Sequence, residues 1–286
     1  MNTRKTYLVA VTFLVPALLS VILLRLWPAA FAVVDSLYAP RATSMSLENF
    51  SYIFGDPVFQ KSLWVTMIYS IIVNPLQIAV AMALALLFNS KVRYINFWRA
   101  IVVLPVAIPQ SVSAVVWGVG LRPDGWVNSV LQALGFDAQR FLTSPDQALG
   151  SIILIVSWIG VGYWMTFLLA GLQDIPKSLY EAVKIDGANV FQQFWHVTLP
   201  LLRRPLTFVL VANTVSNFLV FAPVQILTSG GPRGSTNLIM NEIYTRAFIS
   251  GDPSSASAAT VVLVAVVLAV VIIQFRLMRE PTEVNS

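Results

Sequence analysis

Uncharged polar side chains recur inside the longest apolar stretches of this chain, at Asn74, Gln77, Gln110, Asn213, Ser216 and Asn217. Amides and hydroxyls both donate and accept hydrogen bonds, so they suit the hydroxyl groups of a polar solute or a neighbouring helix. The spacing of 213, 216 and 217 places three of them on one helical face. For any single residue a bond to a neighbouring helix is the simpler explanation. As a set, the residues are consistent with the lining of a solute cavity.

Aromatic residues accompany these polar ones. Tyr163 and Phe218 could cover the apolar faces of a ring-shaped, hydroxyl-rich solute, as could Trp117 and Trp158. Phe218 directly follows the polar face at 213–217, although a role facing lipid or the protein core is equally consistent with its position. We include Tyr163 and Phe218 in the predicted solute pathway.

Several kinds of chemistry are excluded by the residues present. The chain has no Cys, which rules out disulfides and thiolate sites, and its single His196 lacks partners for a metal site. A phosphate-binding P-loop requires Gly directly before Lys. The five Lys residues follow Arg4, Gln60, Ser90, Pro176 and Val183. We therefore predict no enzymatic activity, no metal site and no cofactor in this chain.

The elements that must position these residues are membrane-spanning helices. Hydrophobic residues make up 57% and charged residues 11% of 286 positions, against roughly 25% charged in soluble domains. A spanning helix needs about 20 apolar residues. Six stretches qualify, near 7–30, 62–88, 100–120, 149–172, 206–228 and 256–276. The fold class is therefore all-α, and we expect one membrane domain over 1–286.

The first stretch follows Arg4 and Lys5 and so resembles a signal peptide, but its length favours an uncleaved span. Charged residues inside the predicted spans are scarce. Arg25 lies near the outer end of the first span, where its long side chain can reach the interface. This scarcity argues against an ion relay of the kind that secondary transporters use.

Charge distribution predicts the orientation. Eleven of the 18 basic residues fall on one side if both termini are cytoplasmic: Arg4, Lys5, Lys91, Arg93, Arg99, Lys177, Lys184, Arg203, Arg204, Arg276 and Arg279. Because cytoplasmic loops carry the excess of Lys and Arg, we expect a multi-pass protein of the cell membrane with both termini inside. The same bias accounts for the basic pI, so nucleic acid is not an expected partner.

Proline interrupts three of the predicted spans, at Pro75, at Pro105 and Pro109, and at Pro223. Each Pro removes a backbone hydrogen bond and is expected to bend its helix. Freed carbonyls are tolerated beside neighbouring helices or a water-filled cavity. Packing kinks and a transport pathway remain equal alternatives.

The longest cytoplasmic loop, about 173–205, is a polar island between two apolar stretches. Pro176 suits a first helical turn, Gly187 can end that helix in a left-handed conformation, and Asn189 can cap the next one. Glu181 and Ala182 lie in the middle of the first helix, where a carboxylate and a small side chain favour contact with another protein. The local chemistry indicates a docking surface.

The island is similar to the EAA loop of permease subunits in ABC importers. The similarity rests on the order Glu181-Ala182-Val183, Asp186-Gly187-Ala188, Phe194, Leu199-Pro200 and Pro205. In that family the loop docks into a separate ATPase subunit. The family's second Ala is Val183 here, which adds apolar bulk. The resemblance implies ATPase-coupling roles for Glu181, Ala182, Val183, Asp186, Gly187, Leu199 and Pro200.

A second motif narrows the resemblance. Gly230-Gly231-Pro232, just beyond the fifth predicted span, is a turn that resembles the sugar-type branch of these permeases. The resemblance implies import of a carbohydrate-type solute: a sugar, oligosaccharide, glycoside or polyol phosphate. It also implies a second permease subunit in a heterodimer, two ATPase subunits that bind ATP and Mg²⁺, an extracytoplasmic solute-binding protein, and membrane lipid around the spans. A secondary transporter or channel, or a non-transporting membrane scaffold, remain alternatives.

Overall fold

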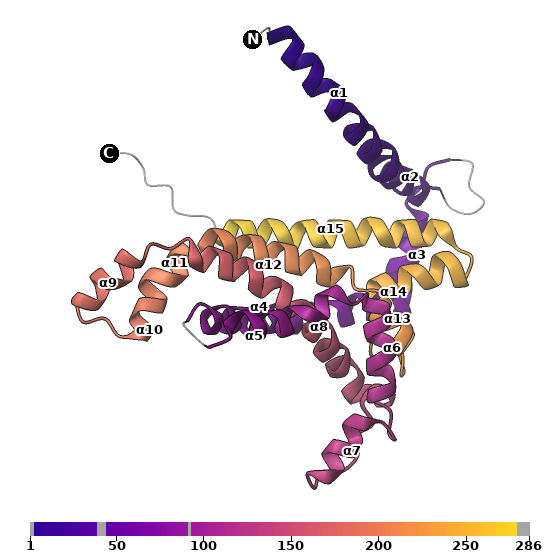
Figure 1. Cartoon of the computed structure of the whole chain (residues 1–286). Helices are drawn as coiled ribbons and strands as arrows, with labels where there is room; N and C mark the ends of the chain where they lie inside the picture. The colour runs from indigo at the N-terminus through magenta and orange to yellow at the C-terminus, as the bar shows by residue number, and fades with distance from the viewer. Residues whose placement is uncertain (1–2, 39–43, 91–92, 279–286) are drawn as a thin grey trace. The chain divides into compact units, whose positions relative to one another are not determined.

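The computed structural model describes residues 3–38, 44–90 and 93–278, with side chains from residue 11 onward. Among these residues the regular structure is entirely helical (Figure 1). The all-α prediction is therefore confirmed. Five helical segments are long and apolar enough to cross a membrane, and a bent pair makes up to six. These segments are Val11–Ser36, Pro57–Phe88, Pro145–Gln173, Arg203–Leu227, Pro253–Met278 and the bent pair Ile95–Ala107 with Gln110–Gly120.

The chain forms two compact units, each described here by itself. The first comprises Met1–Gln60 and Ile243–Ala265, and the second comprises Lys61–Glu242 and Val266–Ser286. The expectation of one membrane domain over 1–286 stays a prediction.

The first unit contains the amino-terminal helices and the region after the fifth predicted span. Its elements are α1 (Thr3–Val21), a π-helical turn (Ile22–Leu26), α2 (Trp27–Ser36), α3 (Glu48–Gly55), the end of α14 (Ile239–Tyr244) with a second π-helical turn (Thr245–Ile249), and the first half of α15 (Pro253–Met278). Arg246 pairs with Asp56 and lies over the rings of Tyr52 and Phe59. The Asn49 amide donates to the backbone oxygens of Ser36 and Tyr38, each at 2.9 Å. The Asn49 contact joins α3 to the end of α2 within this unit.

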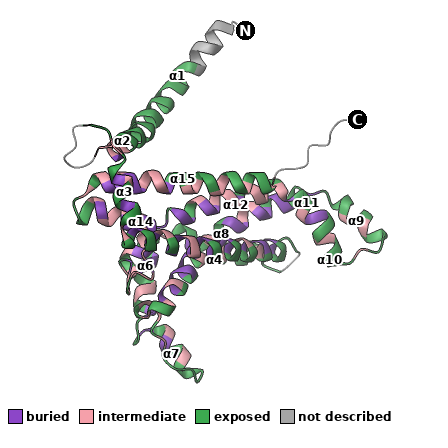
Figure 2. Cartoon of the chain, turned by 180° about the vertical axis from the view of Figure 1, so that it is seen from behind, coloured by how far each residue is buried: buried purple, intermediate pink, exposed green. Residues whose placement is uncertain are grey.

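The second unit contains the helices that surround the functional residues. They are α4 (Pro57–Phe88), α5 (Ile95–Val103), a 3-10 turn (Leu104–Ala107), α6 (Gln110–Gly120), α7 (Trp126–Ala133), a second 3-10 turn (Phe141–Thr143), α8 (Pro145–Gln173), α9 (Lys177–Ile185), α10 (Val190–Gln193), a π-helical turn (Phe194–Thr198), α11 (Leu199–Leu201), α12 (Arg203–Phe218) and α13 (Ala222–Leu227). Of all the spans, α8 has the largest buried share, 61% of its apolar window (Figure 2). It is the central helix of this unit.

Two glycines allow the helices to approach α8 closely. A Cβ added to Gly162 would lie 2.2 Å from the backbone oxygen of Val102, on the α5 side. A Cβ added to Gly171 would lie 2.6 Å from the ring of Pro205, at the start of α12. Since real Cβ atoms do not approach other atoms so closely, only glycine fits at these two contacts. The helices on both sides are therefore held directly against the backbone of α8.

Proline acts differently in the three interrupted spans. Pro75 lies inside the continuous helix α4. Pro105 and Pro109 separate α5 from α6, which meet at 98°, and Pro223 lies in the first turn of α13 after a break in the fifth span. The expected bend is confirmed in the third span, where the two helical segments are bent by 98°. In the fifth span the helix breaks before Pro223. There Pro begins a new helical segment, because its fixed φ suits a first turn.

Candidate functional site

Four buried amides join α4 to α12. The side-chain nitrogen of Asn217 lies 2.8 Å from Asn74 Oδ1, 3.0 Å from Gln77 Oε1 and 3.0 Å from Asn213 Oδ1. The Asn213 nitrogen in turn lies 3.3 Å from Asn74 Oδ1, and the Tyr69 hydroxyl donates to Asn217 Oδ1 at 3.2 Å. Apart from the contact between Asn217 and Asn213 within α12, these are interhelical hydrogen bonds, one of the two alternatives that the sequence leaves open.

The oxygens around the Asn217 nitrogen can accept more hydrogen bonds than its NH₂ group can donate. An NH₂ group carries two hydrogens, yet three oxygens surround the Asn217 nitrogen. At least one oxygen must therefore share a hydrogen or retain spare capacity. A hydroxyl donor from a solute would match that capacity, so the second alternative is also compatible with this geometry.

A cavity of about 270 Å³ opens against this cluster in the second unit. Six of the eight predicted pathway residues line it: Gln77, Gln110, Tyr163, Asn213, Ser216 and Asn217. Ser216, Gln110 and Tyr163 are exposed, whereas the amides at 77, 213 and 217 are buried behind them. The exposed residues are thus accessible from the cavity, and the buried amides lie behind them.

The two remaining pathway residues lie elsewhere. Asn74 belongs to the amide cluster but does not line the cavity. Phe218 is 2% exposed and is absent from the cavity wall. Its side chain points away from the polar face because adjacent helical residues differ in direction by about 100°. Trp117 and Trp158 meet edge to face with ring centroids 5.4 Å apart, and neither lines the cavity.

Sequence reasoning missed several contributors to this site. Tyr69 lies eight residues before Gln77 on α4, which is a same-face spacing that could have revealed it. Trp164 follows Tyr163 and also lines the cavity. Val106 and Ile108, beside the bend between α5 and α6, complete the wall, and only the bend in the chain brings them there.

The polar island forms two short helices connected by a tight turn. Gly187 has a φ of 83° and ends α9, and Asn189 and Gln192 form a reciprocal capping box at the start of α10. Both local predictions are confirmed. The helix begins at Lys177, with Pro176 as its N-cap, one residue later than expected. These caps fix the turn between the helices independently of any partner.

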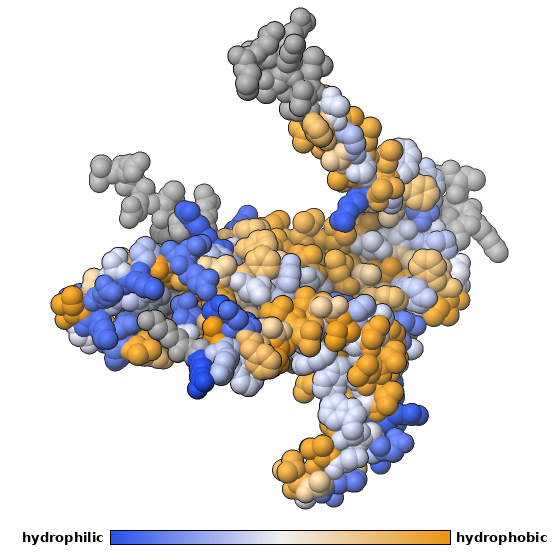
Figure 3. All heavy atoms as spheres, in the orientation of Figure 1, coloured by the Kyte–Doolittle hydropathy of each residue, from blue (hydrophilic) through white to orange (hydrophobic). Residues whose placement is uncertain are grey.

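Most of the predicted coupling residues are exposed. Glu181, Ala182, Asp186, Gly187 and Pro200 are exposed, whereas Val183 and Leu199 are half-buried. Apolar side chains surround them: Ile185 is 87%, Val190 82% and Phe191 71% exposed. In Figure 3 this end of the unit combines hydrophilic and apolar surface. An apolar patch rimmed by polar residues is typical of a protein interface.

The base of the island is anchored in the buried apolar core that the spans form. Ile175 and Leu202 belong to the same buried cluster as Leu168 and Val209 of the spans. The Tyr180 hydroxyl and Thr198 Oγ1, 3.0 Å apart, share a hydrogen bond across the island. Together with the contact between Gly171 and Pro205, these interactions make the island a firm extension of α8 and α12.

Several residues used to predict the topology cannot be placed. Lys91 and Arg279 lie outside the described residues, as do the side chains of Arg4 and Lys5. The orientation of the termini therefore stays a prediction.

The chain is similar to known transport proteins. It is 31% identical over 269 residues, 92% of each chain, to the sn-glycerol-3-phosphate transport system permease protein UgpA of Brucella suis. It is 31% identical to the sulfoquinovosyl glycerol transport system permease protein SmoG of Agrobacterium fabrum, covering 95% of this chain and 91% of the relative. It is 32% identical to a probable ABC transporter permease protein, YurN of Bacillus subtilis, covering 95% of this chain and 96% of the relative.

The fold is shared with a solved transporter. A chain in the crystal structure of a bacterial alginate ABC transporter, in complex with an alginate pentasaccharide-bound periplasmic protein, superposes with a TM-score of 0.86 at 23% identity. The match covers 100% of this chain and 98% of that one. Residues 76–280 match the family model for the binding-protein-dependent transport system inner membrane component. This chain therefore belongs to that family of membrane permeases and serves transport across the membrane.

Proposed function

We propose that this chain is the permease subunit of an ATP-driven importer for a carbohydrate-type solute. The observation that carries the proposal is the composition of the central cavity. Its lining combines amide and hydroxyl groups with the rings of Tyr163 and Trp164, and none of its lining residues in the described chain is charged. Hydroxyl-rich rings present polar edges and apolar faces, which such a lining can bind at the same time.

The names of the relatives support a cargo of this class. They include permeases for sn-glycerol 3-phosphate and sulfoquinovosyl glycerol, which are both polyhydroxylated. The family description names a binding-protein-dependent transport system, which supports delivery of the solute by an extracytoplasmic binding protein. In this proposal the binding protein releases the solute into the cavity beside Ser216 and Gln110.

Separate subunits would supply the energy. In this proposal two ATPase subunits bind ATP and Mg²⁺, and each permease of a heterodimer presents one coupling loop to one ATPase. The apolar patch of Ile185, Val190 and Phe191 supports the docking role. Closure of the ATPases would move the island, and the island would move α8 and α12, which line the cavity. Both termini lie in the cytoplasm in this arrangement.

Uptake into proteoliposomes tests the proposal. The complete transporter, reconstituted with its binding protein, should accumulate a radiolabelled sugar or glycoside only with ATP on the ATPase side. A matched sample with a non-hydrolysable ATP analogue should show none. Accumulation driven by an ion gradient without ATP would instead favour a secondary transporter. ATPase binding without flux of any carbohydrate would favour a scaffold.

A further inference from the structure

A groove separate from the solute cavity lies between α12 and the C-terminal half of α15, which run side by side (Figure 1). Its volume is about 680 Å³. The Gln274 amide donates to Thr214 Oγ1 at 2.7 Å and holds the two helices together beside the groove. The groove is thus a feature of two helices fixed to each other.

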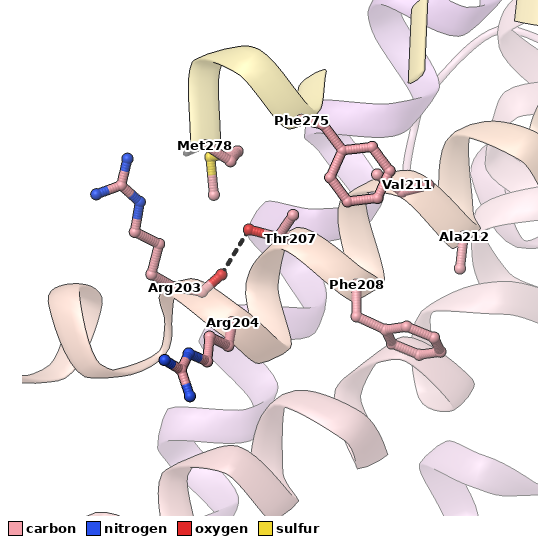
Figure 4. A pocket seen from close by; sticks show the side chains of 8 residues that line it. All are labelled: Arg203, Arg204, Thr207, Phe208, Val211, Ala212, Phe275 and Met278. Carbon is pink, nitrogen blue, oxygen red and sulfur yellow. Dashed lines mark hydrogen bonds between the residues drawn. The ribbon is translucent and has the colours of Figure 1, made fainter. Parts of the chain in front are cut away.

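The groove has a cationic end and an apolar wall (Figure 4). Arg203 and Arg204 lie at the start of α12, and the wall consists of Phe208, Val211, Ala212, Phe275 and Met278. Thr207 lies between them, and its hydroxyl donates to the backbone oxygen of Arg203 at 2.7 Å. None of the lining residues in the described chain is acidic. Among the described residues, the groove therefore combines positive charge with an apolar surface.

The dimensions match one leaflet of a bilayer. From Arg204 to Ala212 the helix rises about 12 Å, and the hydrocarbon of one leaflet is about 15 Å thick. Arg204 is exposed, and Phe208 and Phe275 are each 54% exposed. The cations thus lie where a spanning helix begins, at headgroup level, and the rings lie at the depth of the acyl chains.

A second groove lacks the combination of positive charge and apolar surface. It has a volume of about 560 Å³ and is lined by residues of α4, α5 and α8 such as Leu76, Ile101 and Leu154. Its lining contains no basic residue in the described chain. Acyl chains alone would suit that surface, whereas the groove at Arg203 and Arg204 also selects for a negative headgroup.

We propose that the groove between α12 and α15 binds one anionic phospholipid. The headgroup phosphate contacts Arg203 and Arg204, and an acyl chain lies against Phe208 and Phe275. With the predicted orientation, this lipid belongs to the cytoplasmic leaflet. Because α12 begins directly after the island, the lipid sits at the junction between the coupling loop and the spans.

Lipid retention by the assembled transporter tests the site. The transporter is reconstituted in nanodiscs that contain equal amounts of phosphatidylglycerol and phosphatidylcholine, and the lipids that remain bound are identified by native mass spectrometry. The unaltered transporter should retain phosphatidylglycerol preferentially. The double variant Arg203→Gln with Arg204→Gln should lower that preference by about tenfold, since each basic residue near an anionic surface contributes to binding.

Arg93→Gln is the matched charge control, because Arg93 is an exposed basic residue that lies outside the groove. It should retain the preference. Phe275→Gln leaves both cations in place and removes one ring of the apolar wall, so it should lower the retention of phosphatidylglycerol. This variant tests the site if the double variant fails to assemble. An unchanged preference for phosphatidylglycerol in the double arginine variant, or unchanged lipid retention in Phe275→Gln, would overturn the proposal.

Two further measurements separate the lipid from other occupants. Millimolar inorganic phosphate should not displace the retained phosphatidylglycerol, and displacement would indicate a site for a free anion instead. Because the chain lacks Cys, the variant Thr207→Cys provides a single site for a fluorophore. Spin-labelled phosphatidylglycerol should quench the fluorescence of that label. Cross-linking of that Cys to the second permease subunit would show that protein covers the groove and would overturn the proposal.

Discussion

The side-chain nitrogen of Asn217 lies 2.8 Å from the side-chain oxygen of Asn74, which joins α12 to α4 across 143 residues of sequence. Both residues are buried. Ser216, the neighbour of Asn217, is exposed on the cavity wall. Two adjacent residues of one helix therefore differ: Asn217 holds two helices together, and Ser216 is accessible from the cavity, where the proposed function assigns it a contact with the solute.

Ser216→Ala and Asn217→Ala should separate these tasks. Ser216→Ala should lower the apparent affinity for the imported solute by about 2- to 10-fold, the range for one lost hydrogen bond, without a change in complex yield. Asn217→Ala should cost about 1–3 kcal/mol of stability, because it leaves buried oxygens and the Tyr69 hydroxyl without their partner. Concentration-dependent uptake and thermal unfolding of the complex measure the two effects. Identical behaviour of the two variants would argue against the division.

Gly187→Val should weaken coupling to the ATPase. Its φ of 83° costs other residues about 1–2 kcal/mol, although there is open space around the Cβ position. Gly150→Ala is the matched control, because Gly150 has equally open space within the helix α8 and an ordinary backbone conformation. We expect reduced co-purification of the ATPase and reduced uptake for Gly187→Val, with membrane insertion unchanged. Full uptake in this variant would contradict the coupling role.

Glu181→Lys tests the same surface through charge. Glu181 is exposed in the middle of α9 and suits a basic residue on a partner. Reversal of its charge should reduce ATPase binding and uptake, and the loss should lessen at high salt because exposed charges are screened. Pull-down of the ATPase at two salt concentrations is the measurement. Binding equal to that of the unaltered chain would remove Glu181 from the interface.

Gly162→Ala should destabilise the spans much more than Gly160→Ala. An added Cβ at 162 meets the backbone oxygen of Val102 at 2.2 Å, whereas at 160 the nearest atom is 3.6 Å away, in the Trp164 ring. Overpacking of this kind typically costs about 1–3 kcal/mol. Thermal stability of the purified complex provides the comparison, and equal stability of the two variants would refute the close contact between α5 and α8.

The orientation can be tested with two single Cys substitutions. Asp137 and Ser178 are both exposed and lie in loops predicted outside and inside, respectively. A membrane-impermeant thiol reagent added to intact cells should label Asp137→Cys and leave Ser178→Cys unlabelled until the membrane is opened. The opposite pattern would invert the predicted topology.

Local chemistry predicted the parts of this protein that depend on a few neighbouring residues. Apolar length identified the spans, and the turn at Gly187 and the cap at Asn189 follow from backbone rules that need no tertiary context. The 98° bend between α5 and α6 does not follow from Pro105 and Pro109 alone. Proline ends a helix, but the angle depends on what the next segment packs against.

The grouping of the cavity residues was partly predictable. Helical periodicity alone predicted that Asn213, Ser216 and Asn217 share a face. It also placed Phe218 beside that face, but it could not show that the Phe218 ring is buried. Val106 and Ile108 reach the cavity through the bend. Such residues carry no polar signal, so sequence reasoning could not identify them.

One uninterrupted helix, α8, carries Tyr163 at the cavity and Gly171 at its contact with Pro205. Eight residues separate these two positions, a length of about 12 Å along the helix. A tilt of α8 by about 10° around Gly171 would therefore shift Tyr163 by about 2 Å, enough to break a hydrogen bond or to open a path for one hydroxyl group. In the proposed transporter, small angular changes at the island would thus regulate access to the cavity farther along α8.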